Sequence, residues 1–576
     1  MRFPLLFLLA TAMLRADEAQ ILTPVPVATP QVKDPLVTSK FTPTASAPAF
    51  GTPSWFRKTF HAPPTTRVEL KPPARLNDFV VDGKLELSLR SYIDLVLANN
   101  TDVSVERLSV EINRNNILRA YSIFDPLAVA SFNSTRTTTP AGDVLAGATT
   151  LNQLSQPFRL TVDQVLPTGT RYSVGFNASK TSTNSAFATF NPLLSSNLNF
   201  NFSQPLLRGR GTFFTKLPVT IARGNLRSAE YTVENRILNL VSQAELAYWD
   251  VILAREDLRV QEQALSLSEQ LLKRAQRELE LGAISALDIY QPEAQYANFK
   301  ILVSQARFRQ QEFENVLRRF MGADLDPQVR ELPIVLTETI APPVETALDR
   351  EKLIETALRM RPDLKARRQD LDIDDLTIQG ASNQLKPDLS LTAQYGSYGR
   401  GGTFYQRTNV FTADGTRNTI VSTVPGGFGD ALDQLFGFNF PVYGFGLRLS
   451  LPLRDRRASA DYANAVVTKR LDTLRLRSAE QTVRQDVLNA ISRVESSRAS
   501  VELAKIALDF AQKRVDADQK KYDLGTITLY FLLDSQNALA RAQSDLVEQS
   551  VNYRRNLVNL QRTTGELLAE RNIAVQ

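Results

Sequence analysis

The sequence repeats one plan twice, and this repeat limits the folds that the chain can adopt. Residues 89–130 align with residues 350–391 without a gap, and the identical residues fall mostly at helix-face positions. The identities are Ile93/Ile354, Leu97/Leu358, Asp102/Asp363, Arg107/Arg368, Ile112/Ile373, Ile117/Ile378, Ala120/Ala381 and Pro126/Pro387. A second ungapped match pairs residues 281–285 with residues 524–528. A fixed internal period indicates a repeated structural unit, so we expect two copies, at residues 81–340 and 341–576.

Each copy contains a stretch whose polar and apolar residues predict a very long helix. These helices are expected at about residues 217–281 and 455–524, and returning helices at about 285–320 and 528–568. At 1.5 Å per residue, each long helix would reach roughly 100 Å. A helix of this length with an apolar stripe must pack lengthwise on other helices, as in a coiled coil.

Between the helices lie segments in which apolar and polar residues alternate with a period of two. For example, Leu198, Phe200 and Phe202 alternate with asparagine and serine. Such alternation predicts a β-strand with one apolar face and one polar face. Strong strands of this kind are expected near residues 127–135, 196–204, 388–396 and 445–452.

In an exported chain, these strands suit a membrane-spanning barrel. Backbone polar groups in lipid must all be hydrogen-bonded, so a sheet that crosses a bilayer has to close on itself. Four strands are too few to close around a pore. We therefore expect an α+β membrane protein whose copies share one β-barrel, with long helices continuing the barrel and an internal two-fold repeat.

The N-terminal segment indicates export. An apolar stretch from Phe3 to Leu14 follows Arg2 and is too short to cross a membrane. We interpret residues 1–16 as a signal peptide cleaved after Ala12 or Ala16, with a buried N-terminal helix as the alternative. Residues 17–80 are rich in proline and threonine and are expected to be extended or disordered.

The composition argues against an enzyme and against a metal or cofactor site. The chain has no cysteine, and His61 is its only histidine. The usual zinc or copper ligands and the usual nucleophile–base pairs are therefore missing, so no catalytic, metal or cofactor site is expected. The net charge of +6 is small for 576 residues and the basic residues are not clustered, so no nucleic-acid partner is expected.

In its order of elements, the chain resembles the TolC-like outer-membrane efflux protein family, the outer membrane factors. The resemblance is carried by the repeat, by Gln-Pro-Leu-Leu-Arg-Gly at residues 204–209, and by two Leu-Gly-x-Ile-Ser/Thr turns. It covers residues from about 85 to 576. It implies a homotrimer with a barrel of about twelve strands, about four from each copy, in the lipid of the bacterial outer membrane. It also implies a helical tunnel across the periplasm.

The function implied by the resemblance is that of a passive export duct in a tripartite efflux or type I secretion system. Its partners would be a periplasmic adaptor (membrane fusion) protein and an inner-membrane pump of the RND, ABC or a similar class. Two alternatives stay open, a periplasmic adaptor and a structural coiled-coil envelope protein. An adaptor would usually carry one helical hairpin flanked by compact β domains, and the alternating strands argue against a coiled-coil protein.

The two Leu-Gly turns are expected at the inner tip of the tunnel. Gly282 would end one long helix and Ser285 would cap the next, with Asp288 three residues later, while Gly525 and Thr528 would act likewise. The resemblance implies that an adaptor grips these turns. The candidate docking residues are Gly282, Ala283, Ile284, Ser285, Gly525, Thr526, Ile527 and Thr528.

The resemblance also implies a gate at the tip. Asp288 and Tyr522 stand where a linking pair is expected, and Asp534 where a ring of carboxylates is expected. Three Asp534 carboxylates around an axis would repel one another and attract cations. Phe531 occupies the other ring position and Ile527 replaces an expected arginine, so the constriction is expected to be partly hydrophobic.

Two segments depart from the family pattern. Residues 141–193 insert an apparent hairpin around Leu166-Pro167-Thr168-Gly169, and residues 400–435 insert a glycine-rich stretch. They are either large external loops or additional strands, which leaves the number of strands open.

Overall fold

A computed structural model describes residues 76–142, 148–282, 284–340, 348–407 and 419–573. All of these residues belong to one compact unit, Thr66–Gln576. The expected signal peptide and nearly all of the proline-rich segment, with His61, lie outside the described residues.

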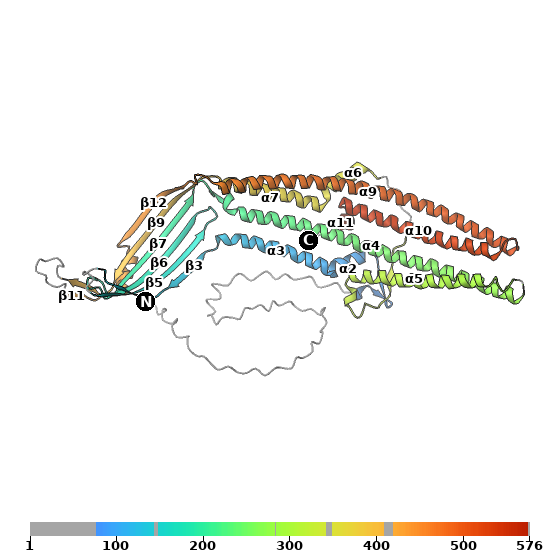
Figure 1. Cartoon of the computed structure of the whole chain (residues 1–576), viewed down its shortest axis with the longest axis horizontal. Helices are drawn as coiled ribbons and strands as arrows, with labels where there is room; N and C mark the ends of the chain where they lie inside the picture. Colours follow the sequence, from blue (N-terminus) through green and yellow to red (C-terminus); the bar gives the residue numbers. More distant parts are fainter. Residues whose placement is uncertain (1–75, 143–147, 283, 341–347, 408–418, 574–576) are drawn as a thin grey trace, which may run out of the picture. The chain divides into compact units, whose positions relative to one another are not determined.

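Two long helices dominate the described chain. Helix α4 spans Thr212–Glu280 with 69 residues, and helix α9 spans Arg456–Asp523 with 68 residues. At 1.5 Å per residue, each is roughly 100 Å long, which confirms the expected length. The returning helices α5 (Tyr290–Phe320) and α10 (Leu529–Thr564) pack along α4 and α9 respectively (Figure 1).

A glycine in the left-handed region ends each long helix. Gly282 and Gly525 both have φ of +72°, and their amides donate to the carbonyls of Leu279 and Tyr522. No other group lies within 4 Å of the place where a Cβ would stand, so the conformation rather than crowding requires glycine. The expectation that these glycines end the long helices is confirmed.

Shorter helices connect the long helices to the strands. Helices α2 (Leu89–Asn99) and α3 (Thr101–Tyr121) come before the first strands of the main sheet, and α6 (Arg350–Met360) and α7 (Pro362–Gln384) come before the later ones. Helix α3 packs on α4, whereas α7 packs on both α4 and α9. The remaining short elements are η1 (Leu76–Phe79), η2 (Ser122–Phe124), η4 (Ala323–Leu325) and α11 (Leu567–Glu570).

The largest apolar core lies where α2, α4, α5 and α10 meet a small sheet. This sheet consists of β1 (Val80–Val81), β2 (Lys84–Leu87) and β8 (Ile334–Leu336), and β2 pairs with β8 in parallel. The buried rings of Tyr92 and Tyr248 lie 5.6 Å apart in this core. No helix in the described part of the chain is both long and apolar enough to cross a membrane.

The second main element is a seven-stranded sheet whose neighbouring strands all pair antiparallel (Figure 1). The strand order is β12-β9-β7-β6-β5-β3, and β4 also pairs with β5. The strands are β3 (Leu127–Phe132), β4 (Thr135–Pro140), β5 (Thr150–Val165), β6 (Arg171–Thr183), β7 (Leu193–Pro205), β9 (Asp388–Gly401) and β12 (Pro441–Ser450). All four segments expected as strong strands therefore lie in one sheet.

The first insert adds strands to this sheet. Strands β5 and β6 form a hairpin and lie between β3 and β7. Because β3 and β4 share one place beside β5, the sheet has six strand positions rather than the four that were strongly predicted. In the second insert, β10 (Phe404–Arg407) and β11 (Ile420–Val424) form a separate pair, and residues 408–418 lie outside the described residues.

The second insert also contains a helix that lies directly on the sheet. Helix α8 (Phe428–Phe436) packs on β7 and β9, and the Ser196 hydroxyl donates to the Ala431 carbonyl at 2.8 Å. A Cβ on Gly399 would stand 1.8 Å from the Ala431 oxygen, and one on Gly401 would stand 2.1 Å from the Gly427 oxygen. The close approach of two backbones therefore requires both glycines.

Candidate functional site

The main sheet has one apolar face that no other part of the described chain covers along most of its length. Phe200 of β7 pairs with Val174 of β6 on one side and with Tyr395 of β9 on the other, so the three side chains share a face. On β12, Phe445 is 89% exposed. Contiguous exposed apolar residues of this kind mark contact with a membrane or a partner.

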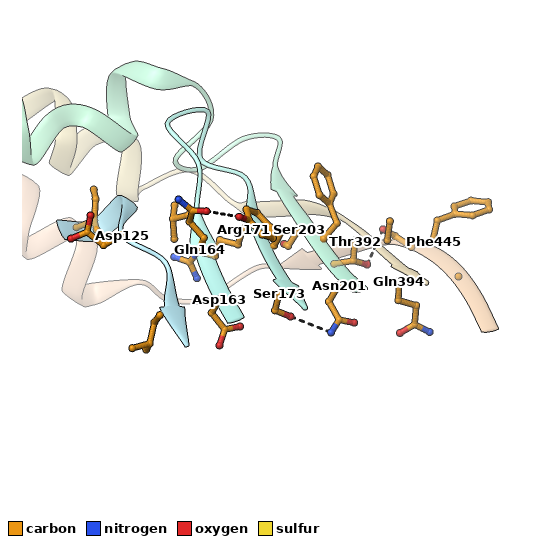
Figure 2. A pocket seen from close by; sticks show the side chains of 18 of the residues that line it. Asp125, Asp163, Gln164, Arg171, Ser173, Asn201, Ser203, Thr392, Gln394 and Phe445 are labelled. Carbon is orange, nitrogen blue, oxygen red and sulfur yellow. Dashed lines mark hydrogen bonds between the residues drawn. The ribbon is translucent and has the colours of Figure 1, made fainter. Parts of the chain in front are cut away.

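The opposite face of the sheet is polar on β5, β6, β7 and β9, whereas on β3 it carries the exposed Leu127. Figure 2 shows Asp163, Ser173, Asn201 and Gln394 pointing to one side of the strands and Phe445 to the other. The amide of Asn201 donates to the Ser173 hydroxyl at 3.2 Å. These polar residues, together with apolar residues such as Leu127, Phe202 and Phe445, line a groove of about 790 Å³. Polar side chains on one face and apolar ones on the other are typical of a barrel with water inside and lipid outside.

A second candidate region lies at the ends of the long helices, where four residues join the last turns of α4 and α9. Arg274 of α4 donates to Glu278 at 2.9 Å and to Asp523 of α9 at 2.8 Å. The Tyr522 hydroxyl donates to Glu278 at 2.9 Å, and the guanidinium carbon of Arg274 lies 4.9 Å from the centre of the Tyr522 ring. We call these four residues the tip cluster.

The tip cluster shifts the pKa values of its own members. The hydrogen bond from Arg274 lowers the pKa of Asp523, and hydrogen bonds to Asp523 and Glu278 raise the pKa of Arg274. Burial, followed by the hydrogen bond to Glu278, raises the pKa of Tyr522 to about 12. At neutral pH the cluster therefore holds a charged arginine, a charged Asp523 and a neutral tyrosine.

A small apolar cluster lies beside the tip cluster. Leu271 of α4 and Leu532 and Leu533 of α10 are buried together, and Tyr522 and Leu529 pack against them. The last turns of the two hairpins are thus held by apolar burial as well as by polar contacts.

The turn after α4 differs from the expectation. Asp288 accepts from the backbone amide of Ser285 at 3.2 Å, and the Ser285 hydroxyl oxygen accepts from the amide of Leu287. Helix α5 begins only at Tyr290 with Ile289 as its N-cap, so the expectation that Ser285 caps this helix is wrong. The local bonds of Ser285 hold a separate turn before the helix instead.

The turn after α9 is closer to the expectation, because Thr528 is the N-cap of α10, although its side chain makes no capping bond. Asp288 and Tyr522, which the resemblance placed together, each bond to another partner within this chain.

The docking candidates lie at exposed turns. Gly282, Ser285, Gly525, Thr526 and Thr528 are exposed, and Ile284 and Ile527 are half-buried. Ala283 lies outside the described residues. The leucines just before the two glycines are more prominent than any of these apolar candidates, because Leu281 is 83% exposed and Leu524 is 79% exposed.

The candidates for the constriction lie near the start of α10. The Asp534 carboxylate forms an ion pair with Arg514 of α9 at 2.6 Å. Phe531 is half exposed, and its ring packs edge-on against Tyr530 with 5.6 Å between the ring centres.

Sequence reasoning missed Arg274, Glu278 and Asp523 of the tip cluster, Arg514, and the exposed leucines. Charged residues spaced as Arg274 and Glu278 are common on any exposed helix. The only available signal was their position in the last turns before a Leu-Gly pair.

Comparison with known proteins identifies the family of this chain. The model of the family described as "Outer membrane efflux protein" matches residues 143–323 and 353–566. TolC of Escherichia coli is 26% identical over 329 residues, which cover 57% of this chain and 62% of TolC, less than two thirds of that protein. The outer membrane efflux protein BepC of Brucella suis is 23% identical over 480 residues, covering 82% of this chain and 84% of BepC.

Solved structures are similar in fold. The CmeC outer membrane channel of Campylobacter jejuni superposes with a TM-score of 0.57 at 15% identity, covering 95% of this chain and 94% of CmeC. The MtrE outer membrane channel of Neisseria gonorrhoeae superposes with a TM-score of 0.54 at 17% identity, covering 83% of this chain and 89% of MtrE.

Proposed function

Since this chain belongs to the outer membrane efflux protein family, we propose that it is the channel subunit of a tripartite efflux or type I secretion system. The protein lies in the outer membrane and extends into the periplasm. In our proposal it is a passive duct that makes and breaks no bond. An inner-membrane pump of the RND, ABC or a similar class supplies the energy, and a periplasmic adaptor protein joins pump and duct.

The observation that carries the proposal is the sheet with one apolar and one polar face. Six strand positions do not surround a water-filled pore, and the edges at β3 and β12 need partners before the sheet can lie in lipid. A homotrimer meets this need. The orders α2–α5 and α6–α10 support the proposal that residues 81–340 and 341–576 are two copies of one plan.

The helix turns are proposed as the periplasmic entrance. The tip cluster links the two hairpins, with Tyr522 at its centre and Asp288 holding the neighbouring turn. Asp534 and Phe531 form the constriction, and Gly282, Ile284, Thr526 and Ile527, with Leu281 and Leu524, contact the adaptor.

Three measurements test this proposal together. Outer-membrane fractions should contain the protein, unheated samples should run on a gel as trimers that heat dissociates, and the purified protein should form conducting channels in planar bilayers. A soluble monomer without conductance would overturn the proposal and favour a periplasmic adaptor or a structural coiled-coil protein.

A further inference from the structure

The hairpin of β5 and β6 occupies the middle of the main sheet. Strand β5 pairs with β3 and β4, and β6 pairs with β7 from Arg171↔Ser203 to Thr181↔Leu193. Strand β3 follows α3, and β7 leads into α4. The hairpin therefore separates two strands that are each joined to a helix, and it has no helix of its own.

The hairpin has an apolar face and a polar face, and each is continuous with the corresponding face of β7. Leu160 of β5 pairs with Phe176 of β6, and Val174 of β6 pairs with Phe200 of β7, so one apolar face runs across all three strands. Phe158 of β5 is 37% exposed, close to the 40% of Phe200. An external loop in water has no need for apolar residues in register with a lipid-facing strand, whereas a piece of barrel wall does.

The two edge strands of the sheet run in directions that allow them to pair between neighbouring copies of the chain. Among the described strands, β12 pairs only with β9, and β3 and β4 pair only with β5. Because six antiparallel positions lie between and including them, β12 and β3 run in opposite directions. The β12 edge of one copy can therefore pair antiparallel with the β3–β4 edge of the next copy.

We propose that the β5–β6 hairpin is part of the barrel wall, so that three copies of this chain form a barrel of eighteen strands, six positions from each copy. The partner at each edge is a second copy of the chain. The inference rests on the proposed trimer, and it goes further because it replaces the twelve strands implied by the family resemblance.

The extra strands bring the barrel to the width of the helical part. With strands about 4.8 Å apart and tilted by about 40°, eighteen strands give a circumference of about 110 Å, and twelve give about 75 Å. Helices α3, α4, α7 and α9 of each copy adjoin the sheet. A ring of about twelve such helices, each about 9 Å wide, has a circumference of about 110 Å. The bore then does not narrow at the membrane, and the barrel does not select large hydrated solutes by size.

Single cysteines can test this inference cleanly, because the chain contains none. Phe176→Cys and Asn177→Cys place a thiol on either face of β6, and Phe200→Cys and Asn199→Cys do the same on β7, where every version of the barrel has a strand. Intact outer membranes are treated with a charged maleimide that does not enter lipid. We expect Asn177→Cys and Asn199→Cys to react about tenfold faster than the other two, because a thiol in lipid stays protonated. All four should react alike after denaturation.

The trimer on an unheated gel is measured in the same preparations, which separates the two proposals. If trimers form and β7 alternates while both β6 cysteines react fast, the hairpin lies in water and the eighteen-strand barrel is wrong, although the channel stands. If the protein is a soluble monomer, both proposals fail. Val174→Cys and Ser173→Cys repeat the β6 comparison, so that one poorly folding variant does not decide the result.

Discussion

The hydroxyl of Tyr522 donates a hydrogen bond to the Glu278 carboxylate at 2.9 Å and so ties the last turn of α9 to the last turn of α4. Both helices end two or fewer residues after these positions. If the periplasmic entrance opens by separating the two hairpins, this bond is one that opening has to break. Removing this hydrogen bond is therefore the most direct test of the gate.

Tyr522→Phe is expected to raise single-channel conductance in planar bilayers. The change removes one hydrogen bond to a charged group and leaves the apolar ring, which costs the linked tip about 1 to 2 kcal/mol. The open population should then rise by about tenfold for each 1.4 kcal/mol. Tyr530→Phe, at an exposed tyrosine, is the control and should leave conductance unchanged.

Asp288→Ala gives a comparison on the other hairpin. Asp288 holds the turn before α5, so its loss should also raise conductance, but by a smaller factor than Tyr522→Phe. Unchanged conductance in Tyr522→Phe would refute the link at the tip, whatever Asp288→Ala shows.

The tip cluster should loosen at both extremes of pH. The lowered pKa of Asp523 means that its contribution is complete above the ordinary value of 3.8 and is lost as the pH falls through the lowered value. The pKa of Tyr522 is raised to about 12, so its contribution is complete below the ordinary value of 10.0 and is lost as the pH rises towards 12. Conductance measured against pH should therefore rise in strong acid and in strong base.

Two variants identify the groups that cause the acid rise and the alkaline rise in conductance. Asp523→Asn should remove the acid rise, and Tyr522→Phe should remove the alkaline rise. A profile that keeps its shape in both variants would show that other groups control the tip.

Asp534→Asn is expected to lower cation selectivity, measured as a shift in reversal potential. Because Arg514 neutralises part of the Asp534 charge, the shift should be modest. Arg514→Gln should shift the reversal potential in the opposite direction, since it leaves the carboxylate unpaired. If neither variant shifts it, Asp534 does not line the constriction.

Arg571→Ala is expected to destabilise the helical core. Glu245 is 1% exposed and accepts two hydrogen bonds from Arg571, at 2.6 and 3.2 Å. Removing the arginine leaves a buried carboxylate without its cation, which costs on the order of 3 kcal/mol. Urea unfolding followed by circular dichroism would show this as a lower midpoint.

Arg555→Ala is the control for this loss. It breaks a partly exposed ion pair with Asp250 at 3.5 Å and should cost less than about 1 kcal/mol. Equal losses in the two variants would mean that burial of Glu245 does not set the cost.

The long helices and the strongly alternating strands could be predicted because their signals are local. The expected helix at 217–281 begins a few residues later than α4, and Gly282 correctly predicted where α4 ends. The start of α5 was missed, because Ser285 and Asp288 make the hydrogen bonds of a cap in a turn that does not continue into helix.

The place of the β5–β6 hairpin could not be predicted in the same way. Alternation in Phe158, Leu160 and Val162 indicates a strand, but it does not say which strands lie beside it. Pairing of β6 with β7 depends on contacts between segments that the local pattern does not relate. For the same reason, the resemblance paired Tyr522 with Asp288, whereas the register between α4 and α9 places Glu278 beside Tyr522.

The two glycines under α8 bear on how this protein can change over generations. Loops on a protein surface usually accept substitutions freely. Here any side chain at Gly399 or Gly401 would collide with the α8 backbone. If this end of the sheet faces outward, as the proposed duct requires, the exposed side chains of α8 can vary, but the buried contact between α8 and β9 cannot.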